Sequence, residues 1–261
     1  DGGFGRALEP DLRTPSSSAL ATSIGLRILK DLRCPAGHSM VRRAVQYLLN
    51  TFDDIARVWR VAPHDTNDHP HAPWWRDENG SLARTFDGYV INPRAEIVGQ
   101  LHHYAVLVPD EWLFDVTEDT LTAIETIEAL GTGGGDDLVC AIRLAETEAV
   151  PDYFCERLVN RIRAVAPTVV CRDPGAWKTY TITPLKLAQS PQSLVADLLW
   201  DDLQRNLDVV IEQQSQAGCW EPVWSWGDFY PEAWEQARQE WRGCLTLDNL
   251  LLLRSFGRIE P

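Results

Sequence analysis

Histidines and carboxylates are concentrated in one short stretch of the chain, residues 64–71. Its sequence, His-Asp-Thr-Asn-Asp-His-Pro-His, places three imidazoles and two carboxylates within eight residues. Such side chains ligate zinc and similar divalent ions, and they also serve as general acids and bases. The spacing matches no metal signature, so a hydrogen-bonded loop, with or without an acid–base role, is favoured over a metal site. The expected acids are Asp65 and Asp68, and the ligands, if a metal binds, are His64, His69 and His71; the cofactor is left unknown.

Tryptophan is the second type of residue in this chain that can contribute to binding or catalysis, because the chain has 11 tryptophans and a single methionine. The faces of these rings stabilise a carbocation or stack on a sugar ring. Both uses need an acid that protonates an alkene or a glycosidic oxygen, and a second carboxylate as base or counter-charge. The alternative is that the rings only seal the ends of helical hairpins. The expected aromatic wall consists of Trp74, Trp75, Trp220, Trp224, Trp226, Tyr230 and Trp234.

Helices are the elements that must position these side chains. Apolar residues recur with helical spacing through most of the chain, and no segment has the period of a strand. Segments poor in charge, such as 18–32 and 245–253, are expected to be inner helices, and charged ones, such as 39–55 and 193–214, outer helices. The predicted helices are 18–32, 39–55, 92–107, 110–130, 136–149, 151–165, a short one from 184, 193–214 and 232–256.

Residues 58–89 form a long connection without helical period, interrupted by prolines and a glycine. Loops of this length inside a compact domain are usually functional or disordered. Because this one is rich in tryptophan and histidine, a functional loop is expected. It should fold over the tryptophan-rich C-terminal part of the chain. The contacts expected there place Asp65, Asp68 and Trp74 against Trp220 and Trp224.

Two sequence motifs resemble those of a known superfamily. Gln213, Gly218 and Trp220 have the spacing of the QW repeat of squalene and hopene cyclases, and Asp1-Gly2-Gly3-Phe4-Gly5 resembles the turns of protein prenyltransferase beta subunits and related terpenoid cyclases. More closely, residues 1–18 and 68–75 resemble an uncharacterised group of bacterial toroid proteins. The resemblance implies an all-α fold, an α/α toroid of alternating inner and outer helices. It would be one domain over residues 1–261, lacking an N-terminal helix because the chain begins inside a turn motif.

The toroid implied by this resemblance would gather the loops that precede its inner helices at one end of the barrel. Side chains far apart in sequence would then meet at a single mouth. Two further acids are expected there, and four more residues are expected to bind substrate beside the aromatic wall. The added acids are Glu9 and Asp11, and the added binding residues are Arg94, Asp136, Asp137 and Glu221.

Three functions are compatible with these features. The first is a terpenoid-cyclase-like enzyme, an isomerase or lyase that starts the cyclisation or isomerisation of a small hydrophobic or prenylated substrate by protonation. The second is a carbohydrate-active or carbohydrate-binding barrel with the same wall and acids. The third is a non-catalytic binding domain, so enzymatic activity is favoured but left open. A dry, closed cavity would support the hydrocarbon substrate, and an open acidic groove would support the sugar.

Charge and composition limit the partners. The formal charge is −14, from 24 Lys and Arg against 38 Asp and Glu. Binding to phosphate backbones or anionic lipids needs a basic face, so no nucleic-acid partner is expected and a small molecule is. There is no apolar run long enough to cross a membrane. The six cysteines include no CxxC pair, which predicts reduced thiols and a cytoplasmic protein.

Overall fold

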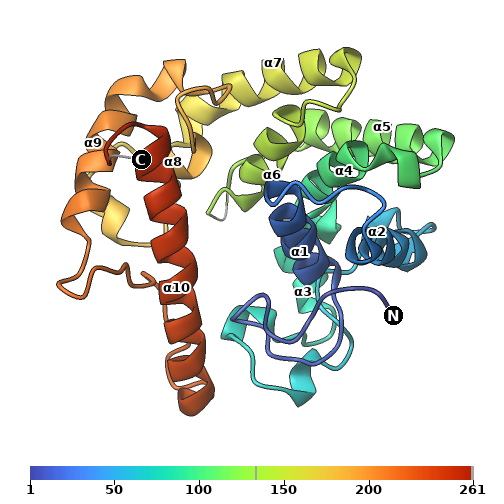
Figure 1. The fold of residues 1–261 in the computed structure, drawn as a ribbon, viewed down its shortest axis with the longest axis horizontal. Helices are drawn as coiled ribbons and strands as arrows, with labels where there is room; N and C mark the ends of the chain where they lie inside the picture. Colours follow the sequence, from blue (N-terminus) through green and yellow to red (C-terminus); the bar gives the residue numbers. More distant parts are fainter. Residues whose placement is uncertain (133, 260–261) are drawn as a thin grey trace.

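The computed structural model describes residues 1–132 and 134–259, which are mostly helical (Figure 1). Within these residues it contains ten α-helices, short 3-10 turns and one two-stranded antiparallel pair. The all-α prediction is therefore confirmed. The α-helices are α1 (Ala19–Asp31), α2 (Ser39–Thr51), α3 (Ser81–Thr85), α4 (Arg94–His103), α5 (Asp110–Thr126), α6 (Asp136–Ala145), α7 (Asp152–Val169), α8 (Pro184–Leu187), α9 (Trp200–Glu212) and α10 (Pro231–Ser255).

Local signals explain where several of these helices begin. The Ser18 side chain accepts a hydrogen bond from the Ala21 amide and so caps α1, and Thr183 caps α8 in the same way, with a proline at its first position. The first turns of α5 and α6 each carry two acidic residues, which favour the positive end of the helix dipole.

Several observed boundaries differ from the predicted ones, and the largest difference is at α9, which begins at Trp200 and not at residue 193 because a 3-10 turn (Asp197–Leu199) precedes it. The helix expected over 39–55 ends at Thr51, because β1 (Phe52–Asp53) pairs with β2 (Val58–Trp59). Helix α3 lies inside the predicted loop. Helix α7 continues past Pro167, since a proline in the last turn removes only one hydrogen bond of the helical ladder.

The helices pack against one another in a regular order. Helices α1, α4, α6 and α8 contact one another in that sequence, while α2, α5, α7 and α9 pack against α1, α4, α6 and α8 respectively. Nine of the ten residues of α4 are buried, as expected for an inner helix. In contrast, only Ala237 and Leu253 are buried in the 25-residue α10, which lies apart from α1 and α6 in Figure 1.

The segment after β2 builds a second apolar cluster of its own. Trp75, Leu82 and Tyr89 pack there with Leu12 from the N-terminal loop and Trp226 from the C-terminal one. The indole of Trp75 stacks on Phe86 at 5.3 Å. The prediction that this segment covers the tryptophan-rich C-terminal region is thus confirmed in outline, although the residues that make the contact differ from those expected.

Both sequence motifs form tight junctions. Gly218 adopts a φ of 78° after α9, and the buried indole of Trp220 donates to the Val210 carbonyl at 2.8 Å. In the N-terminal turn, a Cβ on Gly5 would lie 2.1 Å from the carbonyl oxygen of Ser16, so only glycine permits the backbone approach seen there.

Candidate active site

The centre of the site is Asp11, a buried carboxylate that accepts hydrogen bonds from three tryptophans. Its Oδ1 atom receives the indole N–H groups of Trp226 and Trp241, both at 2.8 Å, and its Oδ2 atom receives that of Trp224 at 3.2 Å. An indole N–H can only donate, so all three bonds favour the ionised carboxylate. Burial nevertheless raises the pKa of Asp11, and the three indoles oppose that rise.

Glu9 lies two residues away and is also buried, with 8% of its surface exposed. Burial, followed by the charge of Asp11, raises its pKa from 4.5 to about 8, and the hydrogen bond from Trp75 at 3.3 Å only partly offsets this. Two adjacent carboxyl groups with different environments separate into an acid and a base. At neutral pH, Glu9 therefore carries a proton, while the three indole N–H groups favour the charged form of Asp11.

A third carboxylate, Asp136 at the start of α6, is close enough to raise the pKa of Glu9 further. Its Oδ2 atom accepts the hydroxyl of Tyr180 at 2.6 Å, and its Oδ1 atom lies 2.7 Å from the ammonium of Lys186 on α8. That ammonium is also 4.6 Å from the centre of the Tyr180 ring. Tyr180 is 55% exposed and its ring lies edge-on to Trp224 at 6.2 Å, so it marks the solvent side of the site.

The loop that carries the acids is held from two directions. The backbone of residues 11–13 pairs with residues 70–72 of the long connection, through Ala72 N to Asp11 O at 2.8 Å and Arg13 N to Pro70 O at 3.1 Å. On the other side, the Arg13 guanidinium makes a bidentate ion pair with Glu240 of α10, at 2.7 and 3.1 Å. These contacts fix both carboxyl groups relative to the helix that supplies Trp241.

Neither acid expected in the long connection belongs to this group. Asp65 accepts hydrogen bonds from Ser16 at 2.7 Å and Thr14 at 2.9 Å; burial works to raise its pKa, but these bonds outweigh it and lower the pKa. Its role is to hold the N-terminal loop, and it is a poor proton donor at neutral pH. Asp68 is exposed at the end of a short turn. The expected contacts of Asp65, Asp68 and Trp74 with Trp220 and Trp224 are wrong, because this loop packs through Trp75 and Trp226 instead.

Several predicted binding residues are engaged elsewhere. The buried Arg94 pairs with Asp119 on α5 at 3.6 Å, and Asp137 accepts the Gly131 amide. Trp220 closes the end of α9. The ring of Trp234 packs against that of Trp226, with centroids 5.7 Å apart. The other members of this set are Trp74, which is exposed, Tyr230, which packs near His71, and Glu221, which pairs with Arg238 and Arg242.

The three histidines are not gathered around one point. His64 is exposed and His69 is partly exposed, 3.7 Å from Asp65. His71 is buried, its Nδ1 atom 2.7 Å from the His69 carbonyl oxygen. Among residues 1–132 and 134–259, no three His, Cys, Asp or Glu side chains are arranged to hold a metal ion.

Sequence reasoning did not select Trp241, Tyr180 and Lys186 for the site. Trp241 lies in the middle of a long helix, where an isolated tryptophan is usually core packing. Tyr180 and Lys186 belong to an irregular stretch and a one-turn helix. The local sequence gives no sign of their shared partner, which is 44 residues distant for Tyr180.

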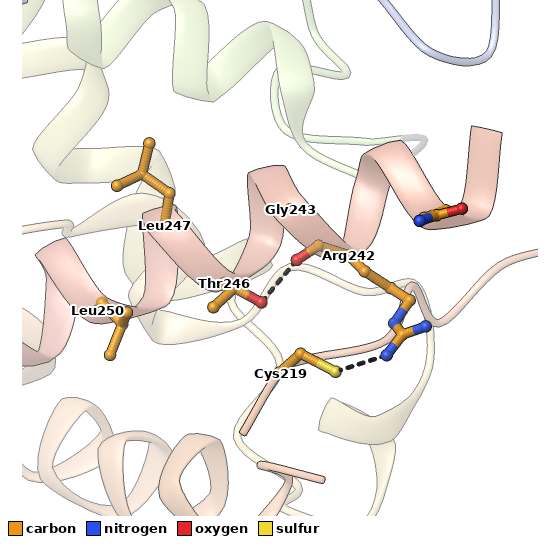
Figure 2. A pocket seen from close by; sticks show the side chains of 7 residues that line it. Cys219, Arg242, Gly243, Thr246, Leu247 and Leu250 are labelled. Carbon is orange, nitrogen blue, oxygen red and sulfur yellow. Dashed lines mark hydrogen bonds between the residues drawn. The ribbon is translucent and has the colours of Figure 1, made fainter. Parts of the chain in front are cut away.

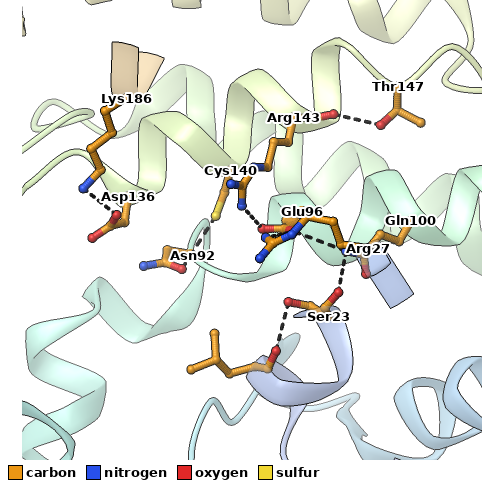
Figure 3. Close-up of polar contacts among 11 residues, drawn as sticks. Ser23, Arg27, Asn92, Glu96, Gln100, Asp136, Cys140, Arg143, Thr147 and Lys186 are labelled. Atoms are coloured by element: carbon orange, nitrogen blue, oxygen red, sulfur yellow. Dashed lines mark hydrogen bonds and ion pairs between the residues drawn. The ribbon is translucent and has the colours of Figure 1, made fainter. Parts of the chain in front are cut away.

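A second polar cluster joins α1, α4 and α6 (Figure 3). Glu96 of α4 is ion-paired to Arg27 of α1 at 2.7 Å and to Arg143 of α6 at 2.6 Å. Burial acts to raise the pKa of Glu96, but the two arginines outweigh it and lower the pKa. Cys140, one turn before Arg143, places its sulfur 3.6 Å from Asn92 Oδ1.

A separate cavity of about 460 Å³ lies beside α10, outside the acid–base site (Figure 2). Cys219 lies at its edge, with its sulfur 3.1 Å from the Ser215 hydroxyl and 3.0 Å from the Arg242 guanidinium. These two hydrogen bonds lower the pKa of the thiol, which increases its thiolate fraction. All six cysteines are free; the cytoplasmic location stays a prediction.

Comparison of the chain with models of protein families, with curated proteins and with solved structures finds no match. In the described part of the chain, no helix is both long and apolar enough to cross a membrane.

Proposed function

We propose that this protein is an acid–base enzyme in which protonated Glu9 gives a proton to the substrate and the Asp11 carboxylate stabilises the cation that develops. The observation that carries the proposal is the pairing of a buried Glu9, neutral up to a pH of about 8, with an Asp11 fixed by three indole N–H groups. Two carboxyl groups in these states are what acid-initiated chemistry requires.

In the proposed reaction, Glu9 protonates a leaving oxygen or an alkene and becomes a carboxylate. The bond polarised by this proton breaks or rearranges, and the positive charge is stabilised by Asp11 and by the faces of Trp224 and Trp241. The cation then adds water or loses a proton, and the proton released in either case returns to the Glu9 carboxylate. Asp11 cannot turn away, because its three donors come from a loop and from α10. Asp136 and Tyr180, beside Glu9, supply hydrogen-bonding groups on the exposed side, where a substrate enters.

The surroundings favour a polar, ring-shaped substrate such as a sugar. The side chains near the acids and along the inner helices are largely charged, including Asp136, Lys186, Arg143 and Glu96. A hydrocarbon cannot hydrogen-bond to these groups, whereas sugar hydroxyls can. Indole faces stack on the apolar side of sugar rings, so a sugar would contact both the charged side chains and the tryptophans of the site.

The second candidate is acid-initiated cyclisation or isomerisation of a small hydrophobic or prenylated substrate, favoured by the indoles of Trp224, Trp226 and Trp241 around one carboxylate. It agrees with the resemblance to terpenoid cyclases. With it we propose the α/α toroid as the arrangement of the helices. The alternating contacts of α1, α4, α6 and α8 with one another and with their outer partners support this arrangement.

A ligand screen followed by turnover measurements tests the proposal. Oligosaccharides and prenyl diphosphates are compared by thermal shift, since a ligand at 100 times its dissociation constant stabilises the fold by about 2.7 kcal/mol. For a converted ligand, Glu9→Gln should lower the rate by about 10²- to 10⁴-fold, and the wild-type rate should fall above a pH of about 8. Glu148→Gln, at an exposed position, is the matched control and should retain full activity. Unchanged turnover in Glu9→Gln would refute the proposal.

A further inference from the structure

Arg27 and Arg143 form a pair of cations that the acid–base chemistry does not use. They come from α1 and α6 and bind the two different oxygens of one carboxylate, Glu96 on α4. The Glu96 side chain is 7% exposed, whereas those of Arg27 and Arg143 are 34% and 32% exposed. Each guanidinium is therefore anchored to a buried carboxylate while about a third of its side chain is exposed, and the three groups together carry one net positive charge.

The buried carboxylate is itself firmly held. The Gln100 amide donates to Glu96 Oε1 at 3.3 Å and to the Ser23 carbonyl at 2.8 Å, which links α4 to α1 (Figure 3). In the described part of the chain, Glu96 is the one hydrogen-bond partner of both guanidiniums. A guanidinium has five N–H donors in a fixed fork, so each arginine has donors that its hydrogen bond to Glu96 does not use.

This pair lies at a defined place relative to the acids. Arg143 is seven residues after Asp136 on α6, and Asp136 is near enough to Glu9 to affect its pKa. At 1.5 Å per residue the separation along the helix is about 10 Å. Cys140, which is buried, and Asn92 lie between Asp136 and Arg143 (Figure 3), so a ligand seated at Glu9 would have to extend past them, along α6, to reach the arginines.

We propose that Arg27 and Arg143 bind an anionic group of the substrate, a carboxylate or a phosphate, at about 10 Å from the bond that Glu9 protonates. The inference rests on the proposed function for the position of that bond. Planar guanidinium forks match the oxygens of both anions, and Glu96 places two of them side by side. In a chain of net charge −14, this pair gives an acidic substrate its attachment point.

One protein group competes with such a ligand. Burial raises the pKa of Asp248 on α10, and the charges of Arg27 and Arg143 oppose that rise, so Asp248 lies within electrostatic range of both. An anion that reaches the arginines must overcome the repulsion of this carboxylate. Removing its charge should therefore strengthen anion binding.

Binding of two matched pairs of probes tests the proposal by calorimetry. Trigalacturonate is compared with its methyl ester, and geranyl diphosphate with geraniol, so each pair differs in charge and the two pairs separate a carboxylate from a phosphate source. The wild type should bind at least one anionic probe more tightly than its neutral counterpart. Arg27→Gln and Arg143→Gln should weaken that probe at least tenfold without affecting the neutral one, and Asp248→Asn should strengthen it.

Three outcomes overturn the proposal. They are equal binding of each charged and neutral pair by the wild type, unchanged anion binding in both arginine variants, and no gain in Asp248→Asn. The Asp248 variant keeps the test decisive if the arginine variants fold poorly. Glu9→Gln separates the two proposals. If the protein binds anions selectively and Glu9→Gln retains full turnover, Glu9 is not the acid but the anion site stands. If Glu9→Gln loses turnover and the wild type shows no preference for anions, the anion site is wrong but the acid role of Glu9 stands.

Discussion

Replacement of Glu9 by glutamine should stabilise the protein, and the gain should grow with pH. In the folded protein Glu9 has a pKa of about 8, against 4.5 when it is free of the fold. Between pH 4.5 and about pH 8, the folded state keeps a proton on Glu9 that the unfolded state loses. The wild type therefore loses stability as pH rises from about 4.5 to about 8. The amide of the variant does not titrate, and it keeps the shape of the neutral acid.

The size of the effect follows from linkage at about 1.4 kcal/mol per pH unit. The glutamine variant should gain about 3 kcal/mol over the wild type at pH 7, and less than about 1 kcal/mol at pH 5. Urea unfolding of both proteins at several pH values measures the difference, with Glu148→Gln as the control that should follow the wild type throughout. Equal stability of Glu9→Gln and wild type at pH 5 and pH 8 would show that Glu9 is ionised in the fold, and the reasoning would be wrong.

The remaining predictions concern the neighbours of this acid. Trp226→Phe removes a buried hydrogen-bond donor to Asp11, so it should destabilise the fold by about 1–3 kcal/mol and raise the pKa of Asp11. Urea unfolding measures the loss of stability, and a stability no lower than that of the wild type would contradict the prediction. Glu96→Gln leaves Arg27 and Arg143 without their shared carboxylate and should cost about 3 kcal/mol or more at pH 7, measured in the same way, with exposed Glu128→Gln as the control. Cys219 should react with iodoacetamide faster than the other five cysteines at pH 7, and Arg242→Gln should slow it; peptide mass spectrometry that finds another cysteine modified first would refute this.

The helices could be predicted from the sequence because their signals are local. Apolar spacing, the Ser18 cap and the acids that open α6 act within one or two turns, and α1 and α6 begin close to the expected residues. The short α3 and the β1–β2 pair were missed because each contains five residues or fewer, too few to show a period.

The site was predicted in part. Glu9, Asp11, Trp75, Trp224 and Asp136 were all expected at one mouth, and the structure brings them together. Asp65 was expected there as an acid, but its partners Thr14 and Ser16 are about 50 residues away in sequence. The charge of each carboxyl group depends on its burial and on hydrogen-bond donors that are distant in sequence. Neither the burial nor these donors can be read from the neighbouring residues in the sequence.

The most direct test of the central claim is the titration of Glu9 itself. Carbon-13 NMR of protein labelled at the glutamate side-chain carboxyls, with Glu9→Gln to assign the resonance, follows each glutamate from pH 3 to pH 10. A Glu9 carboxyl that titrates near pH 8, well above the exposed glutamates, is the predicted result. If the resonance lost in Glu9→Gln titrates near 4.5 in the wild type, Glu9 is a carboxylate at neutral pH and cannot be the proton donor.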